Sequence, residues 1–211
     1  MTAYDGNGVL KATFNCATGA AISSDSRFLF FTIKTPDEEV RALKLKKTKK
    51  EDMPLDKLGI YNVATGVTDT IPRLKSYKTP SKWSGWIAWQ TEPMKEKPAA
   101  PSDTTSKNGE KAKKPKSQSA DNGYTLYIRN MGTGATDTVL FVTDYIFAEE
   151  AEKIMYATTG DNNGGEPGVI IVDLRKGDRS VLYTGKARYR QLTMDKKGER
   201  AAFILSFDEK D

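Results

Sequence analysis

The sequence that decides the fold is Leu58-Gly59-Ile60-Tyr61-Asn62-Val63-Ala64-Thr65-Gly66-Val67-Thr68-Asp69-Thr70-Ile71. Similar stretches occupy residues 126–139 and, with a looser match, residues 169–182. Each copy consists of an apolar segment, a polar segment that contains Gly, and a second apolar segment. This pattern predicts a β-hairpin, because Gly readily adopts the positive φ that a tight turn requires. We therefore expect the same hairpin three times.

A second repeated feature is a short apolar strand that contains an aromatic residue. Its four copies lie at 26–32, 84–90, 151–157 and 198–204, with the aromatic residues Phe31, Trp89, Tyr156 and Phe203. The spacing from each hairpin Gly to the next of these aromatic residues is nearly constant, at 23, 22 and 26 residues. The return spacing varies, and its shortest version gives a unit of about 43 residues, the length of a four-stranded propeller blade. The sequence thus predicts an all-β chain whose residues 1–211 form one partial β-propeller of about three to four blades, each blade a four-stranded antiparallel sheet.

Two insertions, at 35–57 and 93–122, occupy the same connection of the repeat, as repeat architectures allow. The first contains a basic run at 41–50 and is expected to form a short helix or an extended arm. We favour a solvated insertion over a patch for nucleic acid or an acidic partner, because a charge run without interleaved aromatic residues is weak evidence for nucleic-acid binding. The second is rich in Lys, Pro, Ser, Ala and Thr, lacks aromatic residues, and is predicted to be disordered or a flexible loop.

The composition limits the chemistry of the chain. It contains no histidine, which excludes a Ser-His-Asp or Cys-His triad and any His-based metal site within it. Lysine, carboxylate or tyrosine chemistry stays open. Neither a Gly-Lys-Ser/Thr phosphate loop nor a Gly-x-Ser-x-Gly nucleophile elbow occurs. We therefore predict no catalytic residue, no cofactor and no metal site in this chain.

Two groups of acidic residues are interpreted as structural. The loop at 160–168 offers oxygen ligands for calcium but lacks the alternating ligand spacing of an EF-hand, so a Gly-rich turn between strands is favoured. Asp69 and Asp137 occupy matching positions of two repeats. Because catalytic carboxylates have no need to recur in every repeat, a role in turns or strand ends is expected for both.

The aromatic cluster around residue 86 is the candidate ligand site. Trp89 occupies the repeated aromatic position and is expected in the core. Trp83 and Trp86 lie beside a predicted loop, where propellers meet their ligands, although core packing remains an alternative for both. We retain Trp83, Trp86 and Tyr77 as possible ligand or rim contacts and give the neighbouring Arg73 no role.

Charge and cysteine content say little about the compartment. The net charge is +5, and a single cysteine cannot form an internal disulfide. No apolar run approaches the ~20 residues of a membrane helix, and residues 1–8 lack the basic and apolar regions of a secretion signal. A membrane partner is therefore not expected.

The order of these motifs resembles the N-terminal β-propeller of bacterial prolyl oligopeptidase family serine peptidases. The resemblance covers most of residues 20–211 and rests on the hairpin at 60–66, the basic insertion at 46–54 before it, and the segment at 73–78. It implies a propeller that caps an α/β-hydrolase domain of the same parent chain and admits short peptides. It also implies a secreted or periplasmic protein. The family's Ser, Asp and His lie in that hydrolase domain, so no catalytic residue is carried over.

The chain departs from the family in blade number, because the family's propellers have seven or eight blades. We therefore expect a fragment whose open arc leaves strand edges unpaired. The main rival is a free-standing propeller that binds a protein partner, similar to the bacterial Tol-system propellers. A third reading, nucleic-acid binding, rests on residues 41–50 alone and is not favoured.

Overall fold

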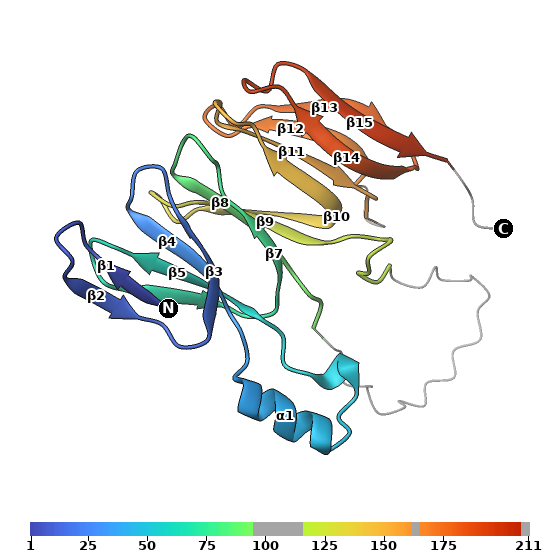
Figure 1. Ribbon diagram of the computed structural model, residues 1–211. Helices are drawn as coiled ribbons and strands as arrows, with labels where there is room; N and C mark the ends of the chain where they lie inside the picture. The colour runs from blue at the N-terminus through green and yellow to red at the C-terminus, as the bar shows by residue number, and fades with distance from the viewer. Residues whose placement is uncertain (95–115, 162–164, 208–211) are drawn as a thin grey trace.

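The computed structural model describes residues 1–94, 116–161 and 165–207, which form mainly antiparallel β-strands (Figure 1). The strands, in chain order, are β1 (Thr2–Tyr4), β2 (Leu10–Thr13), β3 (Ala17–Ile22), β4 (Phe28–Ile33), β5 (Lys57–Asn62), β6 (Thr68–Ile71), β7 (Leu74–Lys78), β8 (Trp86–Thr91), β9 (Tyr124–Asn130), β10 (Thr136–Phe147), β11 (Lys153–Thr158), β12 (Gly168–Asp173), β13 (Arg179–Thr184), β14 (Arg188–Met194) and β15 (Ala201–Ser206). Neighbours in sequence are neighbours in each sheet. Such an up-and-down order is the connectivity of a propeller blade.

The long strand β10 joins two blades. Its first part pairs with β9, as in Val139 opposite Leu126, and its last part pairs with β11, as in Ile146 opposite Met155. The register shifts between these parts, near Phe141, whose φ is 56°. β10 is therefore the outermost strand of the second blade and the innermost strand of the third, which makes one seven-stranded sheet of both.

The blades can now be counted. Strands β3 to β6 form the first, β7 to the start of β10 the second, and the end of β10 to β13 the third. The pair β14–β15 supplies two further strands, the inner half of a fourth blade, while β1–β2 is a separate hairpin beside the first blade. The prediction of an all-β partial propeller of three to four blades is confirmed.

The three predicted hairpins, β5–β6, β9–β10 and β12–β13, share one turn design. In the first, the Asn62 side-chain oxygen accepts hydrogen bonds from the backbone N–H groups of Ala64 (3.0 Å) and Thr65 (3.1 Å). Gly66 closes the turn with a φ of 71° and donates its N–H to the Asn62 carbonyl. The other turns repeat both contacts, with Asn130 and Gly134 in the second and Asp173 and Gly177 in the third.

The core lies between blades, because each central strand buries both of its faces. Along β8, Trp89 faces the first blade, whereas Ala88 faces the third. Tyr156 in β11 likewise packs toward the second blade, and its neighbour Met155 packs toward β14–β15. Burial on both faces explains why these strands are continuous apolar runs without polar alternation.

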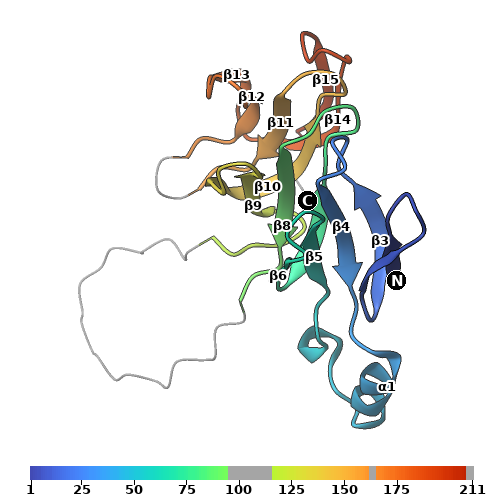
Figure 2. The same ribbon diagram turned by 90° about the vertical axis from the view of Figure 1, so that its left-hand side faces the viewer.

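The connections divide between two faces of the molecule. The end of the molecule that carries the connections β4–β5, β8–β9 and β11–β12 is called the insertion face. The opposite end, called the hairpin face, carries the three hairpins and the loops β3–β4, β7–β8, β10–β11 and β14–β15. The insertion at 35–57 holds α1 (Asp37–Leu45) and the 3₁₀ helix η1 (Lys50–Asp52). Figure 2 shows α1 below the first blade, away from the β3–β4 loop. Most of the insertion predicted to be disordered, 95–115, lies outside the described residues.

α1 is the short helix expected as one form of the first insertion. Three acidic residues, Asp37, Glu38 and Glu39, fill its first turn and Lys44 its last, an arrangement that complements the helix dipole. None of its residues is buried. Within the described parts of the chain, no helix has the length and apolarity needed to cross a membrane.

Candidate functional site

Tyr77, one of the three candidate ligand contacts, lies in β7 and links two blades. Its hydroxyl donates a 2.6 Å hydrogen bond to the carbonyl of Gly19 in β3. Partial burial raises the pKa of this phenol, so the hydroxyl stays protonated and can donate at neutral pH. The side chain packs at the edge of the apolar cluster between the first and second blades. Tyr77 therefore already has a structural partner.

Trp83 and Trp86 turn toward the third blade, away from Tyr77. The Trp83 indole N–H donates to the carbonyl of Ala148 (2.9 Å), and its ring meets Phe147 edge to face at 5.5 Å. Trp86 is half-buried against the same inter-blade cluster. The three candidates are thus not brought together: Tyr77 joins the second blade to the first, and the two tryptophans join it to the third.

Trp89 lies in the core, as expected from its place in the repeat. It is 4% exposed and stacks on Tyr127 with ring centroids 5.4 Å apart. The Arg129 guanidinium lies 5.6 Å from the same ring and pairs with Asp69 at 3.0 Å. Asp137 forms a similar but longer ion pair, 3.8 Å from Arg179. These pairs agree with a structural role for Asp69 and Asp137.

At the hairpin face, contacts that run from loop to loop connect the blades. The hydroxyl of Ser24 donates to the carbonyls of Ser81 and Trp83, both at 3.2 Å. Lys82 contacts Glu149 at 2.6 Å and Glu150 at 2.9 Å.

These contacts extend to the last two described strands, because the Glu150 N–H donates to the carbonyl of Lys196 in the β14–β15 loop. The loops of all four blades are therefore connected, which favours a structural role for this face.

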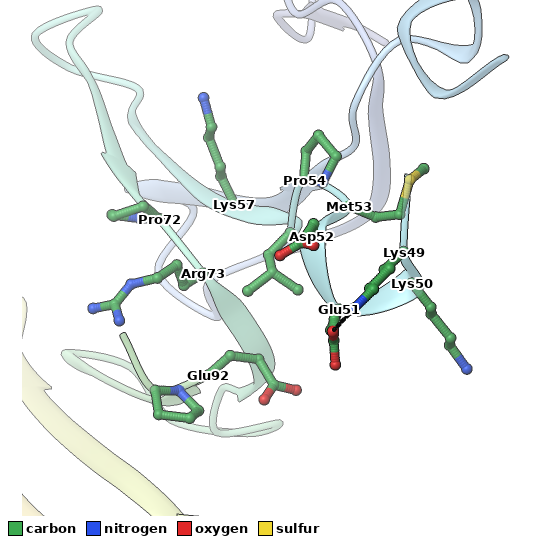
Figure 3. A pocket seen from close by; sticks show the side chains of 12 residues that line it. Lys49, Lys50, Glu51, Asp52, Met53, Pro54, Lys57, Pro72, Arg73 and Glu92 are labelled. Carbon is green, nitrogen blue, oxygen red and sulfur yellow. Dashed lines mark ion pairs between the residues drawn. The ribbon is translucent and has the colours of Figure 1, made fainter. Parts of the chain in front are cut away.

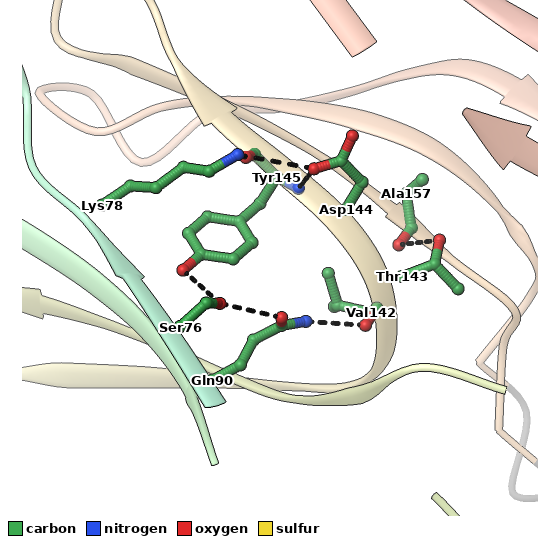
Figure 4. Close-up of polar contacts among 8 residues, drawn as sticks. All are labelled: Ser76, Lys78, Gln90, Val142, Thr143, Asp144, Tyr145 and Ala157. Atoms are coloured by element: carbon green, nitrogen blue, oxygen red, sulfur yellow. Dashed lines mark hydrogen bonds and ion pairs between the residues drawn. The ribbon is translucent and has the colours of Figure 1, made fainter. Parts of the chain in front are cut away.

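A buried polar network ties the inner strands of the second and third blades (Figure 4). The Tyr145 and Ser76 hydroxyls share a 3.0 Å hydrogen bond, and Ser76 donates to the Gln90 side-chain oxygen at 3.2 Å. Gln90 in turn donates to the carbonyl of Val142 at 2.7 Å. Burial raises the pKa of Tyr145 well above its usual value, so it remains neutral. Lys78 covers this network, 3.5 Å from Asp144.

The insertion face is different, because a wide groove lies on it. Its volume is about 1060 Å³, and it lies between η1 with the chain that follows it, the β6–β7 turn, and the end of β8 (Figure 3). The lining residues are Lys49, Lys50, Glu51, Asp52, Met53, Pro54, Leu55, Lys57, Pro72, Arg73, Glu92 and Pro93. A groove lined by both apolar and charged residues can bind a ligand that is itself part apolar and part charged.

A repeated backbone device builds the insertion face. The residue before each complete blade, Cys16, Arg73 or Phe141, has a φ between 55° and 58°. In every case its carbonyl accepts a hydrogen bond from the residue just beyond the second strand of the blade, in the pairs Lys34 to Cys16, Glu92 to Arg73 and Thr159 to Phe141. The sequence could not reveal this device, because Cys, Arg and Phe share no property that signals a left-handed backbone.

The described residues contain no group of three or more Cys, Asp or Glu residues placed to hold a metal ion. In the 160–168 loop, the Asp161 carboxylate accepts the N–H of Gly165 at 2.7 Å, as in a tight turn, while residues 162–164 lie outside the description. Sequence reasoning gave Arg73 no role, and nothing in the sequence predicts that 49–57 and 72–73 meet.

Comparison with known proteins finds fold similarity only. No family model and no curated protein matches the chain. Similar solved structures include TolB from Acinetobacter baumannii (12% identity, TM-score 0.40), an acylaminoacyl peptidase from Pyrococcus horikoshii (11%, 0.47) and the β-propeller domain of the Trilobed protease from Pyrococcus furiosus (9%, 0.44). The alignments cover 96%, 94% and 94% of this chain but 42%, 29% and 56% of the other chains. The chain spans less than two thirds of the length of each of these proteins, and its propeller-like architecture is established by its own strand order.

Proposed function

We propose that the chain is the non-catalytic propeller segment of a prolyl oligopeptidase-like serine peptidase and gates the access of peptides to a hydrolase domain of the same parent chain. The observation that carries this proposal is the difference between the two faces. Contacts between loops connect the blades at the hairpin face, whereas the insertion face carries α1, η1 and a groove of about 1060 Å³. A gate needs a rigid frame with one surface free for the substrate.

The chemistry of the chain supports the same division of labour. Without histidine, the chain cannot supply the general base of a Ser-His-Asp triad. The nucleophile, its base and the oxyanion-stabilising groups then belong to the hydrolase domain. The propeller acts on the substrate before chemistry, by admitting peptides that fit and excluding folded proteins.

The test uses the complete product of the gene that encodes this chain. We expect its sequence to contain a Gly-x-Ser-x-Gly motif followed by Asp and His outside residues 1–211. A fluorophosphonate probe should label that Ser and leave residues 1–211 unlabelled. A complete product that lacks this motif and takes no label would contradict the proposal.

A second function, a propeller module that binds a protein partner, is favoured by one observation. β13 and β15 leave apolar side chains in solvent, with Val181 63% and Ile204 50% exposed, and Leu182 beside them is 43% exposed. A groove of about 460 Å³ that includes Leu182 lies between β13 and β15. In this case the gene product lacks a hydrolase domain, and hydroxyl-radical labelling of Val181 and Ile204 falls when the partner is bound.

A further inference from the structure

The groove on the insertion face, defined above by its twelve lining residues, has more positive than negative charge available to a ligand. Glu92 is already paired with Lys75 at 2.8 Å, and Glu51 lies 3.8 Å from Lys49. Asp52, the third carboxylate of the lining, is not free either. Within the described chain, the side chains of three lining cations have neither an ion pair nor a hydrogen bond: Lys50, Lys57 and Arg73.

Arg73 is the most firmly placed of these cations. The N–H of Glu92 donates to its carbonyl at 2.8 Å, and the N–H of the next residue, Leu74, donates to the carbonyl of Asp56 at 2.7 Å. Its backbone is thereby fixed between the end of the first insertion and the end of β8. Figure 3 shows Arg73 and Glu92 on one side of the groove and Lys49, Lys50 and Glu51 on the other. A guanidinium on a fixed backbone is well suited to bind a carboxylate with two hydrogen bonds.

The rest of the lining indicates what else the ligand contains. The lining also includes Met53, Pro54, Leu55 and Pro72, which offer apolar contact and no hydrogen-bond donor from a side chain. No aromatic residue lines the groove, so bases of a nucleic acid would find no stacking surface. The groove is also larger than one amino-acid side chain needs.

From this geometry we propose that the groove binds an extended acidic peptide, with a carboxylate on Arg73, an apolar side chain against Leu55 and Pro72, and further carboxylates near Lys50 and Lys57. This inference rests on the proposed function, since it names the class of peptide that the gate would admit. Charge complementarity decides the ligand class, because the carboxylates of the groove are already engaged and three of its cations are not.

The experiment measures binding to the 211-residue chain directly. The probe is a rhodamine-labelled hexapeptide in which Leu and Glu alternate, and the readout is fluorescence anisotropy at low ionic strength. Arg73→Gln should weaken binding by about tenfold or more, the effect of losing a charge-assisted hydrogen bond. Arg175→Gln, an equal charge change in the exposed β12–β13 turn on the hairpin face, should leave the affinity unchanged.

Further variants separate binding from folding. Arg73→Gly removes the guanidinium while its φ of 58° suits glycine, so this variant should fold and yet bind as weakly as Arg73→Gln. A peptide with Gln in place of every Glu should lose at least as much affinity as the variants do, because it also gives up its contacts with Lys50 and Lys57. Absence of binding by the wild-type chain, equal binding by Arg73→Gln, or tighter binding of a hexanucleotide of equal charge would each overturn the inference.

Binding and proteolysis can fail separately. If the complete gene product takes no fluorophosphonate label while the chain binds the peptide through Arg73, the peptidase function fails and the acidic-peptide site stands. If the product is labelled but the chain binds the Glu peptide and the Gln peptide with equal affinity, the acidic-peptide site fails and the peptidase function stands.

Discussion

The two faces of this propeller segment use repetition in different ways. On the hairpin face, neighbouring blades are joined by side chains, such as Lys82 with Glu149 and Glu150, or Trp83 with the Ala148 carbonyl. On the insertion face, only the backbone repeats, and the left-handed position carries Cys16, Arg73 or Phe141. A repeated backbone fixes the frame and leaves the side chain open to selection for binding. From this difference we infer that a binding function belongs to the insertion face.

The largest effect is expected where the blades are joined. Tyr145 is 2% exposed and contributes both a ring and a hydroxyl to the interface between the second and third blades. Tyr145→Ala should lower the free energy of unfolding by about 3–5 kcal/mol, as for other buried aromatic residues. Tyr145→Phe keeps the ring and loses the hydrogen bond to Ser76, so its cost should be about 1 kcal/mol. Urea denaturation of the two variants and the wild type measures both.

This pair of variants tests the frame and leaves the groove intact. Variant protein that is still folded should bind the acidic peptide normally, because Tyr145 is not one of the residues that line the groove. A loss from Tyr145→Ala no larger than that from Tyr145→Phe would show that ring burial does not hold the blades together.

The next effect concerns the hairpin turns. Asn130→Ala removes the acceptor for the N–H groups of Gly132 and Thr133 and should cost about 1 kcal/mol of stability. Asn130→Asp should be nearly neutral, because Asp173 makes the same contacts in the third hairpin. Thermal or urea unfolding measures the difference. Equal losses in the two variants would show that the side-chain oxygen does not fix the turn.

These turns were predictable from the sequence, since their geometry demands particular residues at particular positions. Few residue types provide a side-chain acceptor like that of Asn62, and few adopt the positive φ of Gly66. The same residue types therefore recur at these two positions in each hairpin sequence. The aromatic strands were predictable for a similar reason, because burial on both faces requires continuous apolar runs. Local physics thus encodes the blades and their number.

The candidate site was not predictable, because its parts meet only in the folded chain. Trp83 and Tyr77 were candidate ligand contacts, but their polar atoms bond to carbonyls of Ala148 and Gly19, 65 and 58 residues away. Arg73 showed no local signal at all. The continuation of β10 from one blade into the next was also hidden, since no turn residue marks where its partner changes from β9 to β11.

A smaller effect, of opposite sign, is expected at the left-handed position itself. A non-glycine residue in this conformation costs about 1–2 kcal/mol. Glycine avoids that cost but loses about 0.5–1 kcal/mol through the greater freedom of the unfolded chain. Arg73→Gly should therefore raise the free energy of unfolding by about 0.5 kcal/mol, as measured by urea denaturation.

The matched control is Gly134→Ala in the second hairpin. Its φ is 77°, and an added Cβ would meet no atom within 4 Å, so the change tests the backbone conformation alone. It should lower stability, whereas Arg73→Gly should raise it. If both variants lose stability, the Arg73 side chain stabilises the fold, and the insertion face is less free for binding than we infer.

The smallest effect is expected on acidification, and it should appear on the hairpin face. The side-chain hydrogen bond from Lys82 lowers the pKa of Glu150 below its ordinary 4.5, and the backbone N–H of Arg200 lowers that of Asp195 below 3.8. Because their pKa values are lower in the folded state, both groups contribute stability that is fully present above these ordinary values. That contribution is lost as the pH falls through the folded-state pKa values.

A double variant isolates this contribution from the other carboxylates. Urea midpoints of the wild-type chain should hold from about pH 6 to pH 5 and fall below about pH 4, whereas Glu150→Gln with Asp195→Asn should fall less over the same range. Hydrogen exchange should locate the acid-induced opening at the β10–β11 and β14–β15 loops, where the N–H of Glu150 meets Lys196. Arg73 keeps its charge throughout, so the amides around the groove should open no earlier than the core. If the acid-induced opening begins at the groove, the prediction is wrong. The insertion face, and not the hairpin face, would then be stabilised by contacts of ionised carboxylates.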